Sequence, residues 1–399
     1  MKSRTENAGM SSGMILLFAV AVGVAVGNLY WAQPLLANIA AALNVSQGAA
    51  GLLITVTQLG YASGVFFLVP LGDTLNRNRL IPIIMGAASI ALFGCGVAPG
   101  YTLLALSLAA VGFLTISGQL LIPLAGDLAT HDQRGHVIGS VTAGGLTGIL
   151  LSRTISGMLG DAMGWRSIYF LAGTVTLLLS IILALRLPRE RKTKTVGYGG
   201  LLLSTFTAVR RHRSVQVTLV LGACCFSVFT MFWTSLTFFL SEAPYSYSTT
   251  QIGLTGFVGL AGALAARRAG RLHDRGWSVG ATGVGLLLGI ISLVIAGISN
   301  GSIYLLLLAV LLIDIAIQGI NVLNSTRLFT IAPEARSRLN SAFVVSCFLG
   351  GSVGSMLAGI LWQAGGWHLV TVGELALMVI ALVFWLFNRS VLAVKQQES

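Results

Sequence analysis

Long apolar stretches separated by short polar segments recur along the whole chain. Each stretch approaches or exceeds the roughly 20 residues that a helix needs to cross about 30 Å of hydrocarbon. They lie at 14–42, 49–71, 80–98, 102–125, 137–160, 165–187, 214–241, 250–270, 278–298, 302–326, 340–363 and 367–388. The pattern predicts an all-helical integral membrane protein with twelve transmembrane helices.

The second half of the chain repeats the first. Three landmark residues of the fifth and sixth stretches return 202 positions later (350 − 148) in the eleventh and twelfth stretches. They are Gly148, Gly157 and Trp165, which return as Gly350, Gly359 and Trp367. Two such halves can rock around a central site and give alternating access. We therefore expect two six-helix halves at 1–187 and 214–399, joined by a basic cytoplasmic linker at 188–213.

Composition and charge indicate that the chain lies in a membrane and which side its termini face. Of its 399 residues 55% are hydrophobic and 9% are charged, whereas soluble domains carry about a quarter charged residues. The basic residues behind the net charge of +12 concentrate in alternate loops and in both termini. By the positive-inside rule we expect both termini to be cytoplasmic. Without a basic stripe interleaved with aromatics, nucleic-acid binding is excluded.

Chemistry other than transport has little support in the sequence. The four cysteines fall inside predicted spans and the five histidines at loops or span ends, so neither a metal-ligand spacing nor a nucleophile with a base is present. We expect no metal, no cofactor and no enzymatic activity. The expected partners are a small-molecule substrate, protons and membrane lipid. Because each chain already contains both halves, we expect it to function as a monomer.

Asp314 is the main candidate for a functional acid. It lies twelve residues into the stretch 302–326, near mid-membrane, where a charge costs about 2.5 to 3.5 kcal/mol. Gln318, Asn321 and Ser325 follow at helical steps on the same face. Burial disfavours the charged form of a carboxyl group. We therefore predict that Asp314 loads and releases a coupling proton; the alternative is a neutral, hydrogen-bonded strut between helices.

Two further ionisable residues lie inside predicted spans. Arg153 stays charged, so it can offer a fixed positive charge to an anionic substrate or to Asp314. Alternatively its long side chain extends outward toward Asp161. Glu374 lies near the start of the last span, and we expect it to be locally solvated.

Polar residues concentrate in the first and fourth spans of each half. Repeat symmetry therefore predicts a central cavity bounded by 14–42, 102–125, 214–241 and 302–326, with Pro34 able to bend the first span. For any single hydroxyl, a bond to its own backbone is the alternative. The predicted cavity residues are Asn28, Tyr30, Trp31, Gln33, Gln119, Arg153, Thr230, Trp233, Thr234, Gln318 and Asn321.

The loop from Gly270 to Gly276 reads Gly-Arg-Leu-His-Asp-Arg-Gly, which resembles the motif Gly-x-x-x-Asp-Arg-x-Gly of the major facilitator superfamily. The first copy, 72–79, has Asn76 in the acid position, and its acid is Asp73, one residue after the glycine. We expect Asp73 to pair with Arg77, four residues later. In that family the loop latches the cytoplasmic side. The resemblance implies gating roles, with simple topology charges as the alternative, for Asp73, Arg77, Arg134, Asp274, Arg275 and Arg336.

The fifth span is similar to the antiporter motif Gly-x-x-x-Gly-Pro-x-x-Gly-Gly of that family. The match keeps Gly148 and Gly157, while Ser152, Arg153 and Ser156 replace a glycine, the proline and a glycine. Together with the sequence at 28–35, this is similar to bacterial efflux members of the drug/proton antiporter branch, which implies a location in a bacterial inner membrane. The resemblance implies export of a small organic molecule or drug by proton antiport with alternating access. A proton-coupled symporter that imports a metabolite and a transporter-fold sensor are the alternatives.

Overall fold

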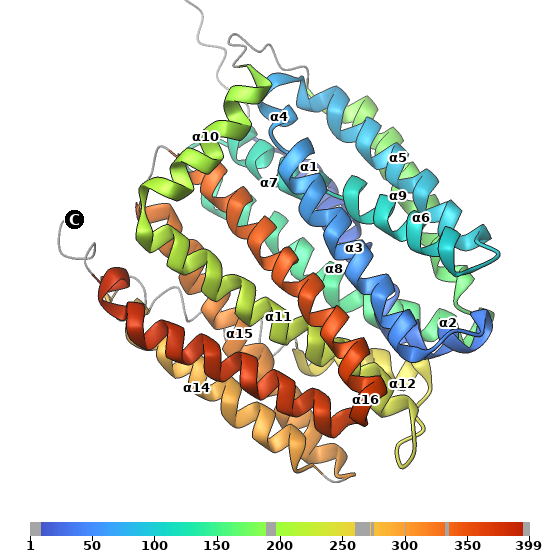
Figure 1. Cartoon of the computed structure of the whole chain (residues 1–399). Coiled ribbons are helices and arrows are strands. Elements are labelled where there is room, and N and C mark those ends of the chain that lie inside the picture. Colours follow the sequence, from blue (N-terminus) through green and yellow to red (C-terminus); the bar gives the residue numbers. More distant parts are fainter. Residues whose placement is uncertain are drawn as a thin grey trace, which may run out of the picture.

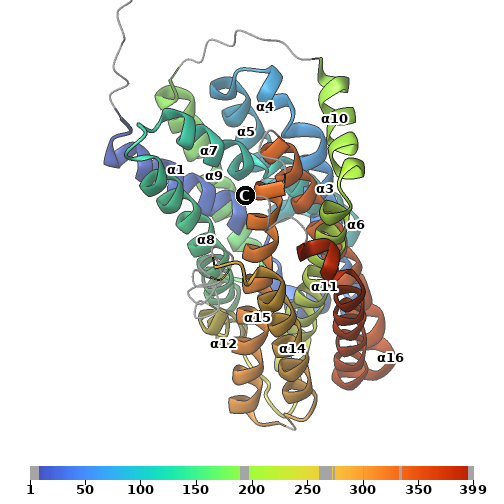
Figure 2. The same cartoon turned by 90° about the vertical axis from the view of Figure 1, so that its left-hand side faces the viewer.

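The computed structural model describes residues 9–188, 197–259, 272, 275–299, 301–331 and 335–393. Within these ranges all regular structure is helical, and most helices lie side by side along a common direction (Figures 1 and 2). The first half comprises α1 (Ser12–Gly27), the 3-10 helix η1 (Gln33–Leu35), α2 (Leu36–Leu43), α3 (Gln47–Leu68), α4 (Leu71–Thr74), α5 (Arg77–Val97), α6 (Tyr101–Leu114), α7 (Ser117–Leu128), α8 (Arg134–Met163) and α9 (Arg166–Arg186). After α10 (Tyr198–Arg211) follow α11 (Arg213–Ser241), α12 (Thr249–Leu254), α14 (Ser278–Gly297), α15 (Ile303–Ile331) and α16 (Arg336–Ala393).

The helices reproduce the predicted membrane architecture. Nine helices among the described residues are long and apolar enough to cross a membrane. One of them, α16, has 58 residues and a kink at Gly365 and Gly366. At 1.5 Å per residue it would measure about 87 Å, so it makes two crossings. The broken α1–α2 segment makes another. Helix α12 lies at the start of the predicted span 250–270, whose residues from 260 on lie outside the described ones. The all-helical, multi-spanning fold is confirmed.

Two predicted spans are interrupted where they face each other. Helix α1 ends at Gly27, so the first span breaks before Pro34, which lies in η1. The amide of Asn28 donates to the hydroxyl oxygens of Thr115 (3.3 Å) and Thr176 (3.4 Å). Thr115, at the break between α6 and α7, donates to the carbonyl of Ala25 (2.7 Å). Irregular backbone at membrane depth is tolerated when it is buried in protein, and the Thr115 hydroxyl satisfies the Ala25 carbonyl there.

The repeat in the sequence is also a repeat in helix packing. A Cβ atom on Gly148 of α8 would collide with the carbonyl of Gly23 in α1. A Cβ atom on Gly350 of α16 would likewise collide with the carbonyl of Ala223 in α11. Small residues at both positions let the paired backbones touch. The first and fifth spans of each half are therefore packed in the same way.

Helix α10 lies within the predicted linker, at one end of the bundle (Figure 1). It buries none of its residues fully, and Leu203 and Phe206 are 68% and 57% exposed. Such a helix suits the membrane interface. The division of the chain into halves around 188–213 stays a prediction.

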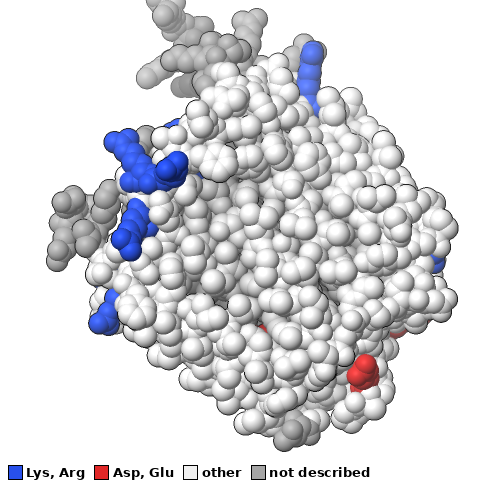
Figure 3. All heavy atoms as spheres, in the orientation of Figure 1, with Lys and Arg blue, Asp and Glu red and all other residues white. Residues whose placement is uncertain are grey.

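Basic side chains gather at the end of the bundle where α10 lies, which we call the basic end. The starts of α5, α8 and α16 and the last turn of α10 supply Arg77, Arg134, Arg336 and Arg211. Figure 3 shows Lys and Arg along this edge of the molecule and an acidic residue near the other end. We call that other end, where α8 ends and α12 begins, the opposite end.

Candidate functional site

Three side chains from different helices meet at mid-depth of the bundle. The guanidinium carbon of Arg153, on α8, lies 3.8 Å from the ring centroid of Trp233, on α11. The indole N–H of Trp233 donates to the Asp314 carboxylate, on α15, at 3.3 Å. Their exposed fractions are only 5%, 4% and 3%. A desolvated cation over an aromatic ring gains about 2 kcal/mol, so Trp233 connects the two charged groups.

The first span completes this arrangement. Arg153 donates through Nε to the Gln33 side-chain oxygen at 2.9 Å, and its guanidinium carbon lies 5.3 Å from the Tyr30 ring centroid. Gln33 stands in η1, so the break in the first span brings its amide to Arg153. We call Tyr30, Gln33, Arg153, Trp233 and Asp314 the central cluster. Within the described part of the chain, Nη2 of Arg153 is buried and has no hydrogen-bond partner.

A small cavity of about 30 Å³ opens beside the central cluster. Arg153, Asp314 and Gln318 line it together with Gly256 and Gly259 of the eighth span. A cavity of this size holds about one water molecule. A Cβ atom on Gly259 would collide with the Asp314 carboxylate, whereas one on Gly256 would lie 3.5 Å from the Arg153 side chain. Glycine at position 259 therefore lets the eighth span pack directly against the Asp314 carboxylate.

Three predicted cavity residues of the first half have other positions in this structure. Asn28 bridges the helix breaks and also accepts from Trp31 Nε1 at 2.8 Å. Trp31 lines a separate groove of about 330 Å³ between α1 and α8. Gln119 donates to the hydroxyl of Tyr61 at 3.1 Å, which joins the fourth span to the second. These polar groups satisfy their neighbours rather than lining the cavity beside Asp314.

The polar residues of α11 divide between two faces. Thr230 accepts from the amide of Gln58, on α3, at 3.3 Å. Thr234 is fully buried beside Gly51 of the same helix. Both therefore lie where the halves pack together, while Trp233 faces the central cluster. On α15, Asn321 lies two turns beyond Asp314, with a buried side-chain oxygen that has no hydrogen-bond partner among the described residues.

Glu374 contradicts the expectation of local solvation. Its side chain is fully buried, and neither carboxylate oxygen has a hydrogen-bond partner within the described part of the chain. It shares a helix face with Thr371 and Met378, which touch glycines of α14. Nearby, Trp367 donates to a carbonyl of α14 at 3.0 Å and stacks on Phe239. These aromatic contacts fill the end of the span where water was expected.

The alternative in which Arg153 extends toward Asp161 does not match its position. The Asp161 carboxylate instead accepts from the backbone N–H groups of Thr249 (3.1 Å) and Thr250 (2.8 Å), at the start of α12. Around Gly157 the two backbones come so close that a Cβ atom would collide with the carbonyl of Thr249. Asp161 therefore closes the opposite end, a role that the sequence reasoning missed.

A related contact joins the second and eleventh spans at the same end. Gln363 donates to the hydroxyl of Ser46, the N-cap of α3. A Cβ atom on Gly359 would lie 2.8 Å from the carbonyl of Gly48. Gln363 stands 202 positions after Asp161 (363 − 161). The repeat offset, applied to polar residues at span ends, was the signal that could have found both contacts.

Arg77, a predicted gating residue at the basic end, has a partner that was not expected. Arg77 forms a salt bridge of 2.9 Å with Asp127 of α7, an acid that sequence reasoning did not select. Helix α4 ends at Thr74 and Leu75 is extended. Asp73 and Arg77 therefore lack the helical spacing on which their expected pairing depended, and that premise is wrong.

The remaining gating residues mark helix ends. Arg336 donates through Nε to the carbonyl of Phe329 at 3.1 Å, near the end of α15. Arg134 is the first residue of α8. Arg275 is exposed shortly before α14, and Asp274 lies outside the described residues.

Comparisons with known proteins extend these observations. The family model of the Major Facilitator Superfamily matches residues 14–331. The chain is 36% identical over 379 residues to the uncharacterized transporter YgaY of Escherichia coli O157:H7, covering 95% of this chain and 96% of that protein. It is 32% identical over 352 residues to the probable transporter SCO4007 of Streptomyces coelicolor, with coverages of 88% and 82%. The solved nucleoside transporter NupG shares the fold, with a TM-score of 0.77 at 14% identity over 94% of this chain and 99% of that chain.

Proposed function

Because the chain belongs to the major facilitator superfamily of membrane transporters, we propose that it exports a small organic molecule in exchange for protons. The observation that carries this proposal is the position of Asp314, whose buried carboxylate lines a cavity together with Arg153 of the other half. An ionisable group at this depth is energetically costly, so its presence points to a function. The proton is its natural ligand there.

Proton binding at Asp314 would change the contacts that join the halves. The charged carboxylate accepts strongly from Trp233 and attracts the guanidinium of Arg153, since hydrogen bonds to ionised groups are the stronger ones. A neutral carboxyl group loses most of both attractions. Protonation therefore loosens the central cluster, and deprotonation tightens it. A transporter needs such a two-state element at its centre.

The substrate would meet the same groups. Nη2 of Arg153 is a buried donor without a partner among the described residues, and leaving it so costs about 1 to 3 kcal/mol. Tyr30, Trp233 and Phe229 add aromatic surface around it. We infer a small amphipathic molecule with a hydrogen-bond acceptor or a negative charge. Export exchanges this molecule for the proton on Asp314.

The structure has the opposite end closed by the contacts of Asp161 and Gln363. From the positive-inside rule we infer that the basic end and both termini face the cytoplasm. The bacterial relatives support an inner-membrane location. Release of an exported molecule then requires the contacts of Asp161 and Gln363 to break. Alternating access is the exchange between that open state and the present one.

A two-stage experiment tests the proposal. Cells that lack or overproduce the protein are first compared for growth inhibition and accumulation across amphipathic drugs, nucleosides, sugars and organic anions. The compound identified is then followed in proteoliposomes with an imposed proton gradient and an internal pH dye. Exchange requires protons to move opposite to the compound. Movement in the same direction would identify an importer, and binding without movement a sensor.

The matched variant is Asp314→Asn, which keeps the shape of the side chain and cannot bind a proton. We expect gradient-driven transport to collapse while exchange of labelled for unlabelled compound continues. Undiminished gradient-driven transport would remove Asp314 from the mechanism. Asp132→Asn, which changes a fully exposed acid just before α8, serves as the control for loss of a carboxylate elsewhere.

A further inference from the structure

The face of α15 that carries Asp314 differs in the two directions along the helix. Toward the basic end, where α15 ends, it continues with Gln318, Asn321 and Ser325. Toward the opposite end the same face carries only apolar side chains, namely Leu311, Val310, Leu307 and Ile303. Polar groups therefore lead away from Asp314 in one direction only, toward the basic end.

In the described part of the chain, none of these three polar side chains is bonded to protein. Gln318 and Ser325 are partly buried and form no hydrogen bond with the described residues. The buried side-chain oxygen of Asn321 also has no partner among them. By contrast Thr326, the next residue after Ser325, donates to the carbonyl of Val322 at 2.8 Å. Polar groups inside a protein that lack protein partners bind water, so this face of α15 is hydrated.

The lining of the cavity beside the central cluster extends in the same direction. It includes Arg153 and Asp314 at one end and Leu146 and Gln318 at the other. Leu146 precedes Arg153 by seven residues (153 − 146) in α8, which begins at the basic end, so this lining rises about 10 Å toward that end. Arg153 and Asp314 are the ionisable residues of the lining, and Trp233 of α11 donates to the carboxylate from another side. The hydrated face of α15 therefore starts in the cavity that holds the acid.

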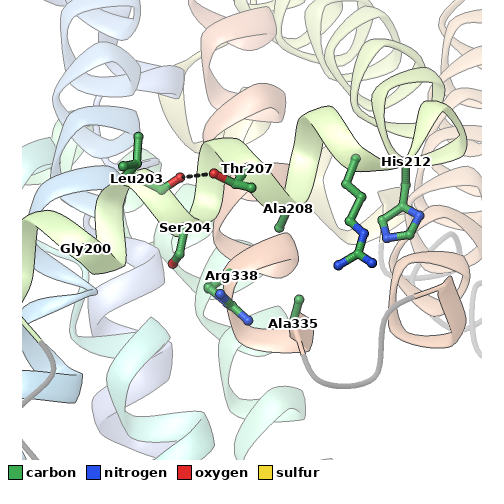
Figure 4. A pocket seen from close by; sticks show the side chains of 9 residues that line it. Gly200, Leu203, Ser204, Thr207, Ala208, His212, Ala335 and Arg338 are labelled. Carbon is green, nitrogen blue, oxygen red and sulfur yellow. Dashed lines mark hydrogen bonds between the residues drawn. The ribbon is translucent and has the colours of Figure 1, made fainter.

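The basic end of the bundle also contains larger hollows. A cavity of about 390 Å³ lies between α10 and the start of α16, where Ala208 faces Arg338 (Figure 4). A groove of about 420 Å³ lies between α3, α10 and α16, over the turns of α3 and α16 nearest that end. At the opposite end the same two spans meet backbone to backbone at Gly48 and Gly359. Water can thus approach the interior from the basic end, whereas the contacts at the opposite end exclude it.

We propose that, in this conformation, Asp314 exchanges its proton with the basic-end side through water molecules held by Gln318, Asn321 and Ser325. The proposal rests on the proposed function, because it gives the route of the same proton. Along α15 the four side chains rise in steps of about 6, 4.5 and 6 Å, and a water that hydrogen-bonds two groups spans about 5.6 Å. The carboxyl group gives one proton to the first water and becomes a carboxylate, and each further water accepts one proton and passes one on. The amides and the hydroxyl position the water and are themselves unchanged.

Thiol labelling of the full chain tests the hydrated route without any transport assay. The variants are Gln318→Cys, Asn321→Cys and Ser325→Cys, and the matched controls are Leu311→Cys and Leu307→Cys, which lie on the same face and are also partly buried. A small, membrane-impermeant methanethiosulfonate is added to either side of oriented membrane vesicles, and the unmodified chain gives the background of the four native cysteines. From the basic-end side we expect the three variants to react at least ten-fold faster than the controls. Equal rates in both sets, or reaction only from the opposite side, would overturn the proposal.

A double variant then tests whether the proton uses this route. Asn321→Leu with Ser325→Ala removes two of the water-binding groups, and Thr326→Ala is the control, because that hydroxyl donates to its own backbone. We expect proton-driven transport by the double variant to fall at least ten-fold, while exchange of labelled for unlabelled compound, which needs no proton release, changes less than two-fold. Undiminished proton-driven transport, or an equal fall in both rates, would overturn the route. Whether a proton is used at all is decided separately by Asp314→Asn, so the two failures are distinguishable.

Discussion

Asp161, near the end of α8, binds Thr249, the first residue of α12, through both the backbone N–H and the hydroxyl of that threonine. The two helices belong to different halves, so this contact closes the opposite end. Gln363 and Ser46 make the corresponding contact between the eleventh and second spans. A carboxylate at a helix N-terminus also interacts favourably with the helix dipole. The Asp161 contact is therefore the stronger of the two.

Replacing Asp161 with alanine should shift the protein toward the state that is open at the opposite end. The side chain is exposed, so the lost interaction is worth about 1 kcal/mol, which raises the open population about five-fold. Spin labels at Met163 and Leu254, both exposed at this end, would report the change as a longer distance in pulsed electron resonance. Asp161→Asn, which keeps one acceptor, should have a smaller effect. An unchanged distance distribution would contradict this role.

Replacing Gly259 with alanine should disable transport. The added Cβ atom would collide with the Asp314 carboxylate, so either the acid or the eighth span must move. Gly256→Ala is the matched control, because its Cβ atom makes only an ordinary contact with Arg153 at 3.5 Å. We expect the rate of proton-driven transport in proteoliposomes to fall at least ten-fold in Gly259→Ala and less than two-fold in Gly256→Ala. Similar rates in both would show that close approach at 259 is not required.

Replacing Trp233 with phenylalanine separates its two contacts. The variant keeps a ring beneath Arg153 but loses the N–H that donates to Asp314. That hydrogen bond favours the charged carboxylate over the neutral one by about 1.5 kcal/mol or more. Its loss should raise the pH midpoint of proton-driven transport by about one pH unit. Trp233→Leu, which removes both contacts, should also reduce the maximal rate; an unshifted profile in Trp233→Phe would count against the coupling.

The architecture was predictable because the bilayer imposes the same requirements on every span of the sequence. Apolar runs near membrane length and one-sided basic loops require only that backbone and charge avoid hydrocarbon. Helix breaks are different. The first span breaks before Pro34, at Asn28, where Thr115 donates to the Ala25 carbonyl, and Thr115 and Thr176 accept from the Asn28 side-chain amide. Those partners come from the fourth and sixth spans and leave no local pattern in the first.

The candidate site shows the same limit at the level of side chains. Helical spacing placed Gln318 on the Asp314 face, and both line the cavity. The same spacing could not separate Trp233 from Thr230, because a polar face at the joint between halves has the same period as one facing a cavity. Asp127 was missed since its partner, Arg77, lies on another helix. Local periodicity identifies a face, and only tertiary packing decides what that face meets.

Glu374 offers a test of whether a buried acid in this fold is used or merely tolerated. Its carboxylate oxygens are buried and have no hydrogen-bond partners among the described residues, which costs about 1 to 3 kcal/mol relative to an apolar side chain of similar shape. Glu374→Leu should therefore raise the midpoint of thermal unfolding in detergent by a few degrees without changing exchange. Met378→Leu, an apolar exchange one turn away, is the control and should cost less than about 1.5 kcal/mol. A stable Glu374→Leu protein that no longer exchanges protons would instead make Glu374 part of the transport mechanism.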